Sequence, residues 1–549
     1  MDTGSTRRNF LAMMGLGAVG VGAALAGCAP RTANSSSGSG SSNDTGTWDE
    51  EFDVIVCGAG IAGLSAAITV AKEGSGQSCL LIEKEASAAG CSPVCAGDFL
   101  GRDENNEYPL QYLKDCATTP IGQSIPDDVL ESFCEGINEN LDWVLSLGAT
   151  LDMLDSTRGV YDMNEEGNAR GDLSSRPKSE YREFASWCAP EYSFNDKAEP
   201  PFNHVYNFLN YVRESDYPGI EYRASTPLED LVQDGEGRVT GVVAKGKRIK
   251  ANKGVIMCTG GYEHNEEFLE GFCGCGSAIS FAMTGNTGDG HKICARHGAD
   301  FWHMHNAAGF WMAGRNLDNS AFSNGALASH TFKRFGITVA KNGRRFYMDW
   351  DGHKSLDVSN DALSDDLSRH VGSRHGVMQF GGEWSHLPMP SIGWFVFDAD
   401  SYNNAFDFDT VGTTDPVSDG WLYKADSIEE LADMCGVPAD ELKDTVDAWN
   451  RSCEEGKDLA FYRPADTLTP VATAPFYAQR CAPAMLNTDG GPKRSAKGEI
   501  LDYEGNPIPG LYAAGEFGSV WGYLYQGNGN VGEAMAFGRI SARNCMQSA

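Results

Sequence analysis

The stretch FDVIVCGAGIAGLSAAITVAKEGSGQSCLLIEKE, residues 52–85, organises the rest of the chain. It opens with a short apolar run that ends at Cys57 and has the length of a buried strand. Apolar residues then recur at helical spacing, and a second apolar run ends at Glu83. The turn before the helix carries three glycines in G-x-G-x-x-G spacing: Gly58, Gly60 and Gly63. This order of strand, turn, helix, strand and acid predicts a dinucleotide-binding unit.

Each residue type in this unit has a chemical reason. Gly58 permits the tight turn, Gly60 lets a pyrophosphate approach the backbone, and Gly63 lets the helix pack closely on the strand. The N–H groups at the helix start attract phosphate, and Glu83 stands where a carboxylate binds a ribose hydroxyl. The competing interpretation is a glycine-rich turn in an ordinary α/β unit, and the terminal acid argues against it.

Length and charge bound the class of protein. The chain has 549 residues, enough for two or three domains with a large core. Its net charge of -33 disfavours nucleic-acid binding and electrostatic docking on anionic lipid. A basic protein partner, such as an electron donor, is compatible with this charge, and so is a simple solvated surface.

The N-terminus predicts export. Arg7 and Arg8 belong to a twin-arginine signal within residues 1–28, and Cys28 ends a lipobox-like sequence. Lipidation of Cys28 would anchor the protein to the membrane at the cell surface or in the periplasm, and cleavage nearby without lipid is the alternative. Residues 29–48 are rich in Ser and Gly and predict a flexible linker.

The cysteines do not indicate a disulfide scaffold. There are 16 of them, mostly at irregular spacing in a long chain. The sequence contains no C-x-x-C-H, so electrons are expected from a separate cytochrome or membrane donor. Two close pairs are interpreted as isolated buried thiols, and one metal site, a [4Fe-4S] cluster, is the alternative. The ligands would be Cys91, Cys95, Cys273 and Cys275.

Further motifs follow downstream. Residues 226–257 predict a β-meander that ends in the strand-to-glycine sequence VIMCTGGY. Residues 287–290 are predicted to start a helix that continues through residue 295, and residues 300–305 alternate as a strand with Phe301, His303 and His305 on one face. Residues 431–450 predict a helix pair.

Four separated motifs together resemble one flavoprotein family, which includes flavocytochrome c-type fumarate reductases, urocanate reductases and ketosteroid dehydrogenases. They are VIVCGAGIAGLSAA with LLIEKE, VIMCTGGY, NTGDG, and GLYAAGEF with GNVGEAMAFGR. The resemblance implies FAD and an α/β fold, with a Rossmann-like FAD-binding domain, a β-meander and an inserted α+β capping domain. The implied boundaries are 49–290 and 466–549 for the FAD-binding domain and 291–465 for the capping domain.

The same resemblance implies a set of residues along the cofactor. Glu83 would take the adenosine ribose, Leu228 would lie near the adenine, and Glu516 would bind the ribityl chain. Val531 would lie near the isoalloxazine. Other implied contacts are Ala62, Ser92, Gly97 and Gly260. The segment GCSPVCAG contains no histidine for a covalent link, so the FAD is expected to be non-covalent.

Departures from the family pattern bear on the substrate. Fumarate reductases hold a dicarboxylate with arginines and histidines, whereas this chain has Asn487 in the clamp region and Tyr525 at the late arginine position. A site without these cations binds a dianion poorly, so fumarate is not expected.

The sequence around Tyr525 resembles the Tyr-x-Gly-x-Gly motif of ketosteroid dehydrogenases. The resemblance implies that the Tyr525 hydroxyl and the Gly529 N–H polarise a carbonyl, as in an oxyanion hole. A core aromatic is the alternative for Tyr525. His353 is the first candidate for the proton donor. The other candidates are His303, His305, Tyr347 and Asp349.

These observations predict a flavin-dependent reductase of a C=C bond conjugated to a carbonyl, in an enone, unsaturated lactone or acrylate. A closer resemblance to the family's cardiac glycoside reductases would imply a steroid-like lactone. One alternative is a ketosteroid dehydrogenase that runs the reverse reaction. Another is a non-catalytic FAD lipoprotein that relays electrons.

Overall fold

The computed structural model describes most of the chain from residue 46 onward. The described ranges are 46–87, 90–95, 97–101, 125–158, 190–198, 204–275, 278–280, 282–308, 311–318, 336–346, 392–405, 413–461, 465–522 and 529–548, with single positions 110 and 463. The predicted signal and nearly all of the linker lie outside these ranges, and so do Tyr525 and His353. Among the described residues, no helix combines the length and apolar character needed to cross a membrane.

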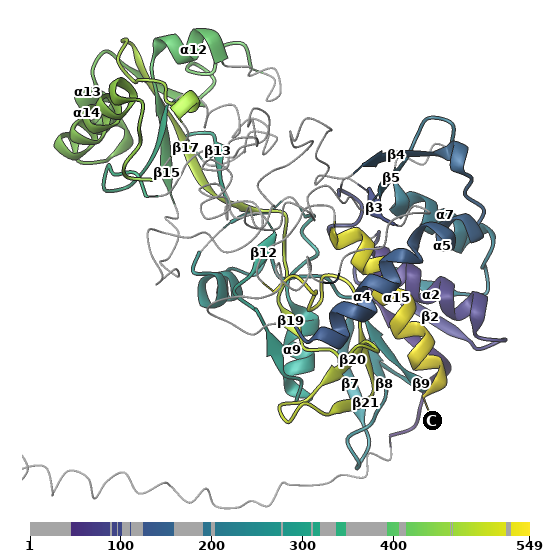
Figure 1. Cartoon of the computed structure of the whole chain (residues 1–549). Helices are drawn as coiled ribbons and strands as arrows, with labels where there is room; N and C mark the ends of the chain where they lie inside the picture. The colour runs from purple at the N-terminus through teal and green to yellow at the C-terminus, as the bar shows by residue number, and fades with distance from the viewer. Residues whose placement is uncertain are drawn as a thin grey trace, which may run out of the picture. The chain divides into compact units, whose positions relative to one another are not determined.

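An eight-stranded sheet carries the opening stretch (Figure 1). Strand β1 lies between β2 and β9 and runs parallel to both. Its last four residues are fully buried, as a strand covered on both faces requires. Strands β6 and β21 extend the parallel set at the two sides. The bounds are β1 Glu50–Cys57, β2 Cys79–Ile82, β6 Glu221–Arg223, β9 Lys247–Met257 and β21 Pro507–Ala513.

The predicted β-meander is confirmed. Strand β7 (Leu228–Gln233) pairs antiparallel with β8 (Val239–Ala244), and β8 pairs antiparallel with β9. Strand β20 (Glu499–Leu501) pairs antiparallel with β21 at the sheet's other edge. Apolar residues of the meander and helix α9 (Asp289–Arg296) form one core cluster against the parallel strands.

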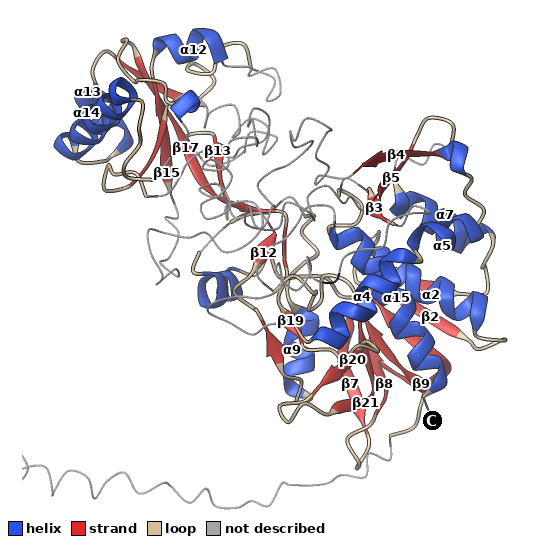
Figure 2. Cartoon of the chain, viewed as in Figure 1, coloured by secondary structure: helices blue, strands red, loops and turns tan. Residues whose placement is uncertain are grey.

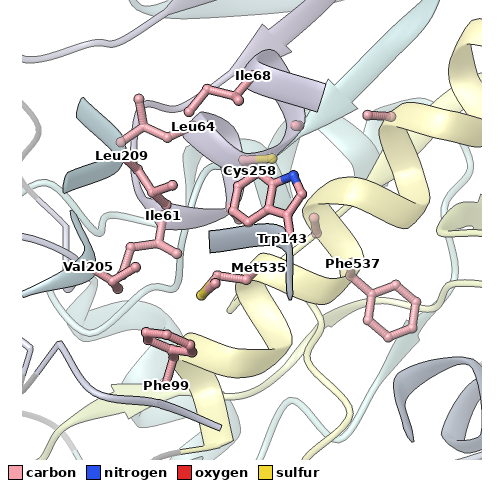
Figure 3. Packing of buried hydrophobic residues seen from close by; sticks show 14 of the residues in the cluster. Ile61, Leu64, Ile68, Phe99, Trp143, Val205, Leu209, Cys258, Met535 and Phe537 are labelled. Carbon is pink, nitrogen blue, oxygen red and sulfur yellow. The ribbon is translucent and has the colours of Figure 1, made fainter. Parts of the chain in front are cut away.

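Helices α2 (Ile61–Glu73) and α15 (Gly529–Gln547) pack against each other within a second core cluster, shown in Figure 3. Their approach depends on small residues, since a Cβ on Gly538 would lie 2.7 Å from the Ala62 carbonyl oxygen. Three further helices contribute buried side chains to the same cluster. They are α4 Asp127–Asn138, α5 Asn140–Ser146 and α7 Val205–Ser215.

A separate six-stranded sheet is built from residues 279–485. Strand β17 is central, and the helix pair α13 (Ile428–Cys435) and α14 (Ala439–Glu455) shares a core cluster with one face. The predicted helix pair is therefore confirmed, while the predicted domain boundaries stay a prediction. The other elements here are β10 Ile279–Ser280, β13 Trp311–Arg315, β14 Ile337–Ala340, β15 Gly393–Phe397, α12 Ala399–Ala405, β16 Leu422–Ala425 and β17 Phe476–Met485.

Shorter elements complete the mixture of helix and strand that the predicted α/β class requires (Figure 2). Three of them form a small sheet in the order β3-β5-β4. The full set of shorter elements is β3 Phe99–Leu100, β4 Leu154–Arg158, β5 Pro190–Phe194, α8 Glu266–Phe268, β12 Ala307–Ala308, β18 Asn487–Thr488 and β19 Gly491–Pro492, with single turns at Leu151–Met153, Leu269–Cys273 and Ala465–Thr467.

One predicted strand is wrong in its extent. Strand β11 covers only Phe301–Trp302, and His303 follows in a left-handed backbone conformation with φ +31°. The His303 ring is buried and hydrogen-bonds through Nε2 to the Asp489 carbonyl oxygen at 3.1 Å. The backbone therefore leaves the strand at His303, and the side chains of Phe301, His303 and His305 do not share a strand face.

Candidate functional site

One cavity lies at the carboxyl ends of the parallel strands and has a volume of about 340 Å³. Its walls come from segments far apart in the sequence, which the sheet brings together. These segments are 57–62, 82–84, 90–98, 226–228, 258–260, 282–293, 486–487, 514–516 and 530–534, in part. A crevice outside the carboxyl ends of parallel strands is the usual ligand site of such sheets.

The glycine turn forms the floor of this cavity. Gly58 has φ +107°, which side chains rarely permit, and a Cβ there would clash with the Cys258 carbonyl. Gly60 is the N-cap of α2 and offers no capping side chain, and its Cβ would lie 2.8 Å from Ser92 Oγ. A Cβ on Gly63 would clash with the Gly58 carbonyl oxygen, so Gly63 permits the close packing of helix on strand.

Two side chains bind the backbone of this turn. Glu83 Oε2 accepts a hydrogen bond from the Ala59 N–H at 3.0 Å, and Oε1 accepts one from the Glu85 N–H at 3.1 Å. Ser92 Oγ accepts one from the Ile61 N–H, at the first position of α2, at 2.9 Å. Glu83 therefore holds the turn as well as facing the cavity, and Ser92 caps the helix in place of Gly60.

The structure brings the predicted cofactor residues to this one cavity, with the exception of Gly63, which lies beneath the turn. The residues that line it are Gly58, Gly60, Ala62, Glu83, Ser92, Gly97, Leu228, Gly260, Glu516 and Val531. Their individual roles toward a cofactor stay predictions.

The cavity suits FAD chemically. It offers a helix N-terminus whose N-cap residue, Gly60, has no side chain in the way of a pyrophosphate, the Glu83 carboxylate for a ribose, and backbone exposed by glycines. The carboxylate oxygens of Glu83 each hold one hydrogen bond and keep lone pairs for a hydroxyl donor.

An acid layer, consisting of Glu263, Asp489 and Glu516, lies at one end of the cavity. Glu263 and Asp489 are almost completely buried, and Glu516 lines the cavity. Burial raises the pKa of all three carboxyls, and mutual repulsion between the acids raises the pKa of Glu516 and Asp489 further. The sequence prediction missed Glu263 and Asp489 as site residues. The sequence signal for both is an acid next to a glycine pair. Glu263 lies two residues after the pair in GGYE, and Asp489 directly precedes the pair in NTDGG.

Asn286 connects this layer to the NTGDG motif. Its Nδ2 donates to Glu516 Oε2 at 3.1 Å and to Cys91 Sγ at 3.6 Å. Asn487, in strand β18, also lines the cavity, and its Nδ2 donates to Asp489 Oδ1 at 3.1 Å. Asn530 Nδ2 donates to Asn487 Oδ1 at 2.7 Å. The segment in which the resemblance implies a clamp histidine therefore offers an amide tied to an acid.

The predicted catalytic residues are only partly described. Gly529 is buried at the start of α15, packed against the Trp521 ring. Tyr525, His353, Tyr347 and Asp349 lie outside the described residues. Burial lowers the pKa of His303 to about 3, so its imidazole is neutral near pH 7 and is a poor proton donor.

Arg344 and Arg345 make contacts next to the six-stranded sheet, with α14 and with Asp458. The Arg345 side chain pairs with the buried Asp458 at 2.9 Å and lies over the Trp449 ring of α14. Arg344 pairs with Glu441, also on α14, at 2.6 Å. Both contacts hold the segment at 344–345 against α14.

The [4Fe-4S] cluster, the alternative interpretation of the cysteine pairs, is not supported. Within the described residues, the side chains close enough to hold a metal are Cys91, Glu263 and Glu516, with none of the other predicted ligands. Cys95 Sγ donates to the Ser92 carbonyl at 3.2 Å, and Cys275 is buried in an apolar cluster with Cys273 packed against it. Burial raises the pKa of all four thiols in the metal-free protein.

Comparisons with known proteins agree with this site. A family model described as FAD binding domain matches residues 53–531. Digoxin reductase of Eggerthella lenta is 27% identical over 99% of this chain and 97% of that protein. The 3-oxosteroid 1-dehydrogenase of Mycolicibacterium smegmatis is 25% identical over 90% of this chain and 97% of that protein. The family resemblance predicted from the motifs is confirmed.

A solved structure shares the fold. The 3-ketosteroid delta1-dehydrogenase of Sterolibacterium denitrificans, in complex with 1,4-androstadiene-3,17-dione, superposes with a TM-score of 0.64. It is 20% identical to this chain, and the match covers 91% of this chain and 100% of that one. The predicted fold class is therefore confirmed.

Proposed function

This chain belongs to the FAD-binding-domain family, and from that premise we propose that it reduces a C=C bond conjugated to a carbonyl. It is an FAD-dependent oxidoreductase that acts on CH–CH groups. The proposed substrates are an enone, an unsaturated lactone such as that of a cardiac glycoside, or an acrylate. We also propose that FAD is held non-covalently.

The observation that carries the substrate class is the surroundings of Asn487, an amide in the cavity wall that is tied to the buried Asp489. Lys84 is the one cationic side chain among the described lining residues, and it is paired with Asp289 at 2.9 Å. Near Asn487, the wall is backed by the acid layer. A dianion such as fumarate would meet repulsion there, whereas a neutral carbonyl would not.

The chain's own residues would bind and polarise the substrate. Bound and reduced FAD supplies hydride-transfer chemistry. The Tyr525 hydroxyl and the Gly529 N–H would donate to the carbonyl oxygen, and His353 would protonate the α-carbon. Gly529 begins α15, so its N–H lies at the positive end of a helix dipole.

The electron source and the location of the protein belong to the same proposal. A separate cytochrome or membrane donor would deliver electrons, because the sequence holds no c-type haem motif. Export would follow the twin-arginine route, with the protein anchored through a lipid on Cys28. These points rest on the sequence alone.

An anaerobic screen tests the proposal. Dithionite-reduced holoprotein is mixed with enones, unsaturated lactones, acrylates and fumarate, and the flavin absorbance is followed. Reoxidation by conjugated carbonyl compounds and not by fumarate is the expected result. Reoxidation by none of the conjugated compounds would overturn the reductase proposal.

Tyr525→Phe separates reduction from electron relay. It removes one donor from the carbonyl oxygen, so reoxidation by the substrate should lose roughly 2–4 kcal/mol of transition-state stabilisation. Reoxidation by a one-electron dye is the control and should be unchanged. A dehydrogenase of a ketosteroid is the second candidate, favoured by the likeness to 3-oxosteroid 1-dehydrogenase. It predicts that a saturated ketosteroid reduces the oxidised holoprotein.

A further inference from the structure

Glu263 and Glu516 form a close carboxyl pair at the cavity wall, with Glu263 buried behind Glu516. One ligand atom from each of Glu263, Glu516 and Cys91 lies within 4.8 Å of the other two. The Glu263 residue is 1% exposed, and Glu516 faces the cavity where the cofactor is expected. Two carboxylates this close and this far from water ionise together only at high cost, so one of them keeps its proton.

Hydrogen bonding identifies where that proton can sit. Glu263 Oε1 accepts from the Thr488 N–H at 2.6 Å and from Thr488 Oγ1 at 3.3 Å, so a proton on Oε1 would break a bond. Glu263 Oε2 is buried, and no described residue hydrogen-bonds to it. Oε2 can therefore carry a proton at no cost in existing hydrogen bonds.

Glu516 is better suited to remain ionised when the cofactor is bound. Its Oε2 accepts from Asn286 Nδ2 at 3.1 Å, and the Cys91 thiol lies close to the carboxylate. Its place in the cavity wall exposes it to further hydroxyl donors from a bound ligand. Glu263 lies one layer deeper, where the Asn286 side chain lowers its pKa but does not outweigh burial.

The groups around Glu263 supply no compensating positive charge. Asp489 and Cys91 interact with the pair electrostatically, and the Tyr262 and Cys273 side chains face Glu263 from its own segment and from the following turn. These groups are neutral or acidic. Burial is the largest cause that raises the pKa of either carboxyl in the pair.

We propose that Glu263 is a buried carboxylic acid that shares one proton with Glu516, with the proton on Glu263 Oε2 in the holoprotein. The pair then contributes one negative charge to the cavity wall, whereas two ionised carboxylates would contribute two. Reduction of FAD adds negative charge to the cavity, and a wall with one charge fewer opposes that addition less. Glu263 would thus be a positioning residue, acting on the cofactor through Glu516.

The inference rests on FAD as the family's cofactor and is independent of the proposed substrate. Its test needs no turnover. Infrared difference spectra of the purified holoprotein in H₂O and D₂O detect the C=O stretch of a protonated carboxyl. The wild-type protein should show one such band at neutral pH, and the band should disappear at a higher pH as the shared proton dissociates.

Glu263→Gln is the informative variant. The amide oxygen can accept both Thr488 bonds while the NH₂ group replaces the protonated Oε2, so the variant keeps the shape of the acid form. It should bind FAD as the wild type does and lose the carboxylic-acid band. In wild type, the reduction potential of FAD should fall more steeply with pH where the band disappears. The variant should lack this extra slope, which a purely structural role would not remove.

Asp489→Asn is the matched control, since Asp489 is the third buried acid and interacts with Glu516. It should leave the band in place. A band that persists in Glu263→Gln, or that vanishes only in Asp489→Asn, would overturn the proposal. One divalent cation per wild-type protein, absent from Glu263→Gln, would also overturn it, because the cation would then compensate the charges of two ionised carboxylates. Absence of any carboxylic-acid band in wild type across the pH range would overturn it without a variant.

Discussion

The glycine turn and the acid layer border the same cavity and work in opposite ways. The turn at Gly58, Gly60 and Gly63 acts through missing side chains, which leave its backbone open to a ligand. The acid layer acts through side chains whose charges are expensive to bury. The turn should therefore be intolerant of added atoms at any pH. The acid layer should tolerate neutral isosteres and respond to pH.

The largest effect is expected from Gly58→Ala. The substitution combines φ +107° with a clash against the Cys258 carbonyl, so it should cost roughly 3 kcal/mol or more and leave little FAD bound. FAD content and unfolding of the purified variant measure this. Gly76→Ala is the matched control, because Gly76 has φ +91° but no neighbouring atom within 4 Å. It should cost about 1–2 kcal/mol and leave FAD content unchanged. Equal costs at the two positions would mean that the clash contributes nothing.

The next effect concerns pH. Burial raises the pKa of Glu263 from an ordinary value of 4.5 to about 7, so the folded state binds the proton more tightly than the unfolded state. The stabilisation is complete below pH 4.5 and is lost as pH rises toward about 7. Glu263→Gln removes this loss, so its stability relative to wild type should rise across this window by up to about 3 kcal/mol. Urea unfolding at several pH values measures the difference. The exposed Glu504→Gln should show no such trend, and a flat difference for Glu263→Gln would contradict the buried-acid assignment.

A smaller effect is expected from Glu83→Gln. The amide oxygen can keep the bond from the Ala59 N–H, but the charge that strengthens this bond and a ribose contact is lost. Affinity for FAD should fall by about 1–2 kcal/mol, measured by fluorescence titration of the apoprotein. Glu85→Gln, at an exposed position two residues later, should leave the affinity unchanged. Equal affinity in Glu83→Gln and wild type would remove Glu83 from the predicted contacts.

The smallest effect is expected from Ser92→Ala. The substitution deletes the acceptor for the Ile61 N–H at the start of α2 and should cost about 1 kcal/mol of stability. Thermal unfolding of the apoprotein measures it, with the exposed Ser87→Ala as the control. A stabilised variant would show that the hydroxyl does not cap the helix.

The two regions also differ in how far the sequence predicts them. The glycine turn is a local motif, since its spacing, its strand and its terminal Glu83 all lie within residues 52–85. The sequence therefore predicts the turn, the neighbouring strands and the α/β fold. The acid layer is assembled from three segments, one of them more than 200 residues before the other two, and no local pattern indicates that Glu263, Asp489 and Glu516 meet.

The errors have similar physical causes. The alternation at 300–305 resembles a strand, but the hydrogen bond of the His303 ring to a distant carbonyl and its left-handed backbone end the strand at Trp302. The two cysteine pairs are each close in sequence, yet only Cys91 lies beside Glu263 and Glu516, while Cys273 and Cys275 belong to a separate hydrophobic cluster. In both cases, tertiary contacts outweigh the local pattern.

The most direct test of the central claim is a stopped-flow measurement on the wild-type protein. Dithionite-reduced holoprotein is mixed anaerobically with an α,β-unsaturated lactone and, separately, with the saturated form of the same lactone. The flavin absorbance should return with the unsaturated compound, saturably in its concentration, and should stay bleached with the saturated one. Equal behaviour of the two compounds would contradict reduction of a conjugated C=C bond at this cavity.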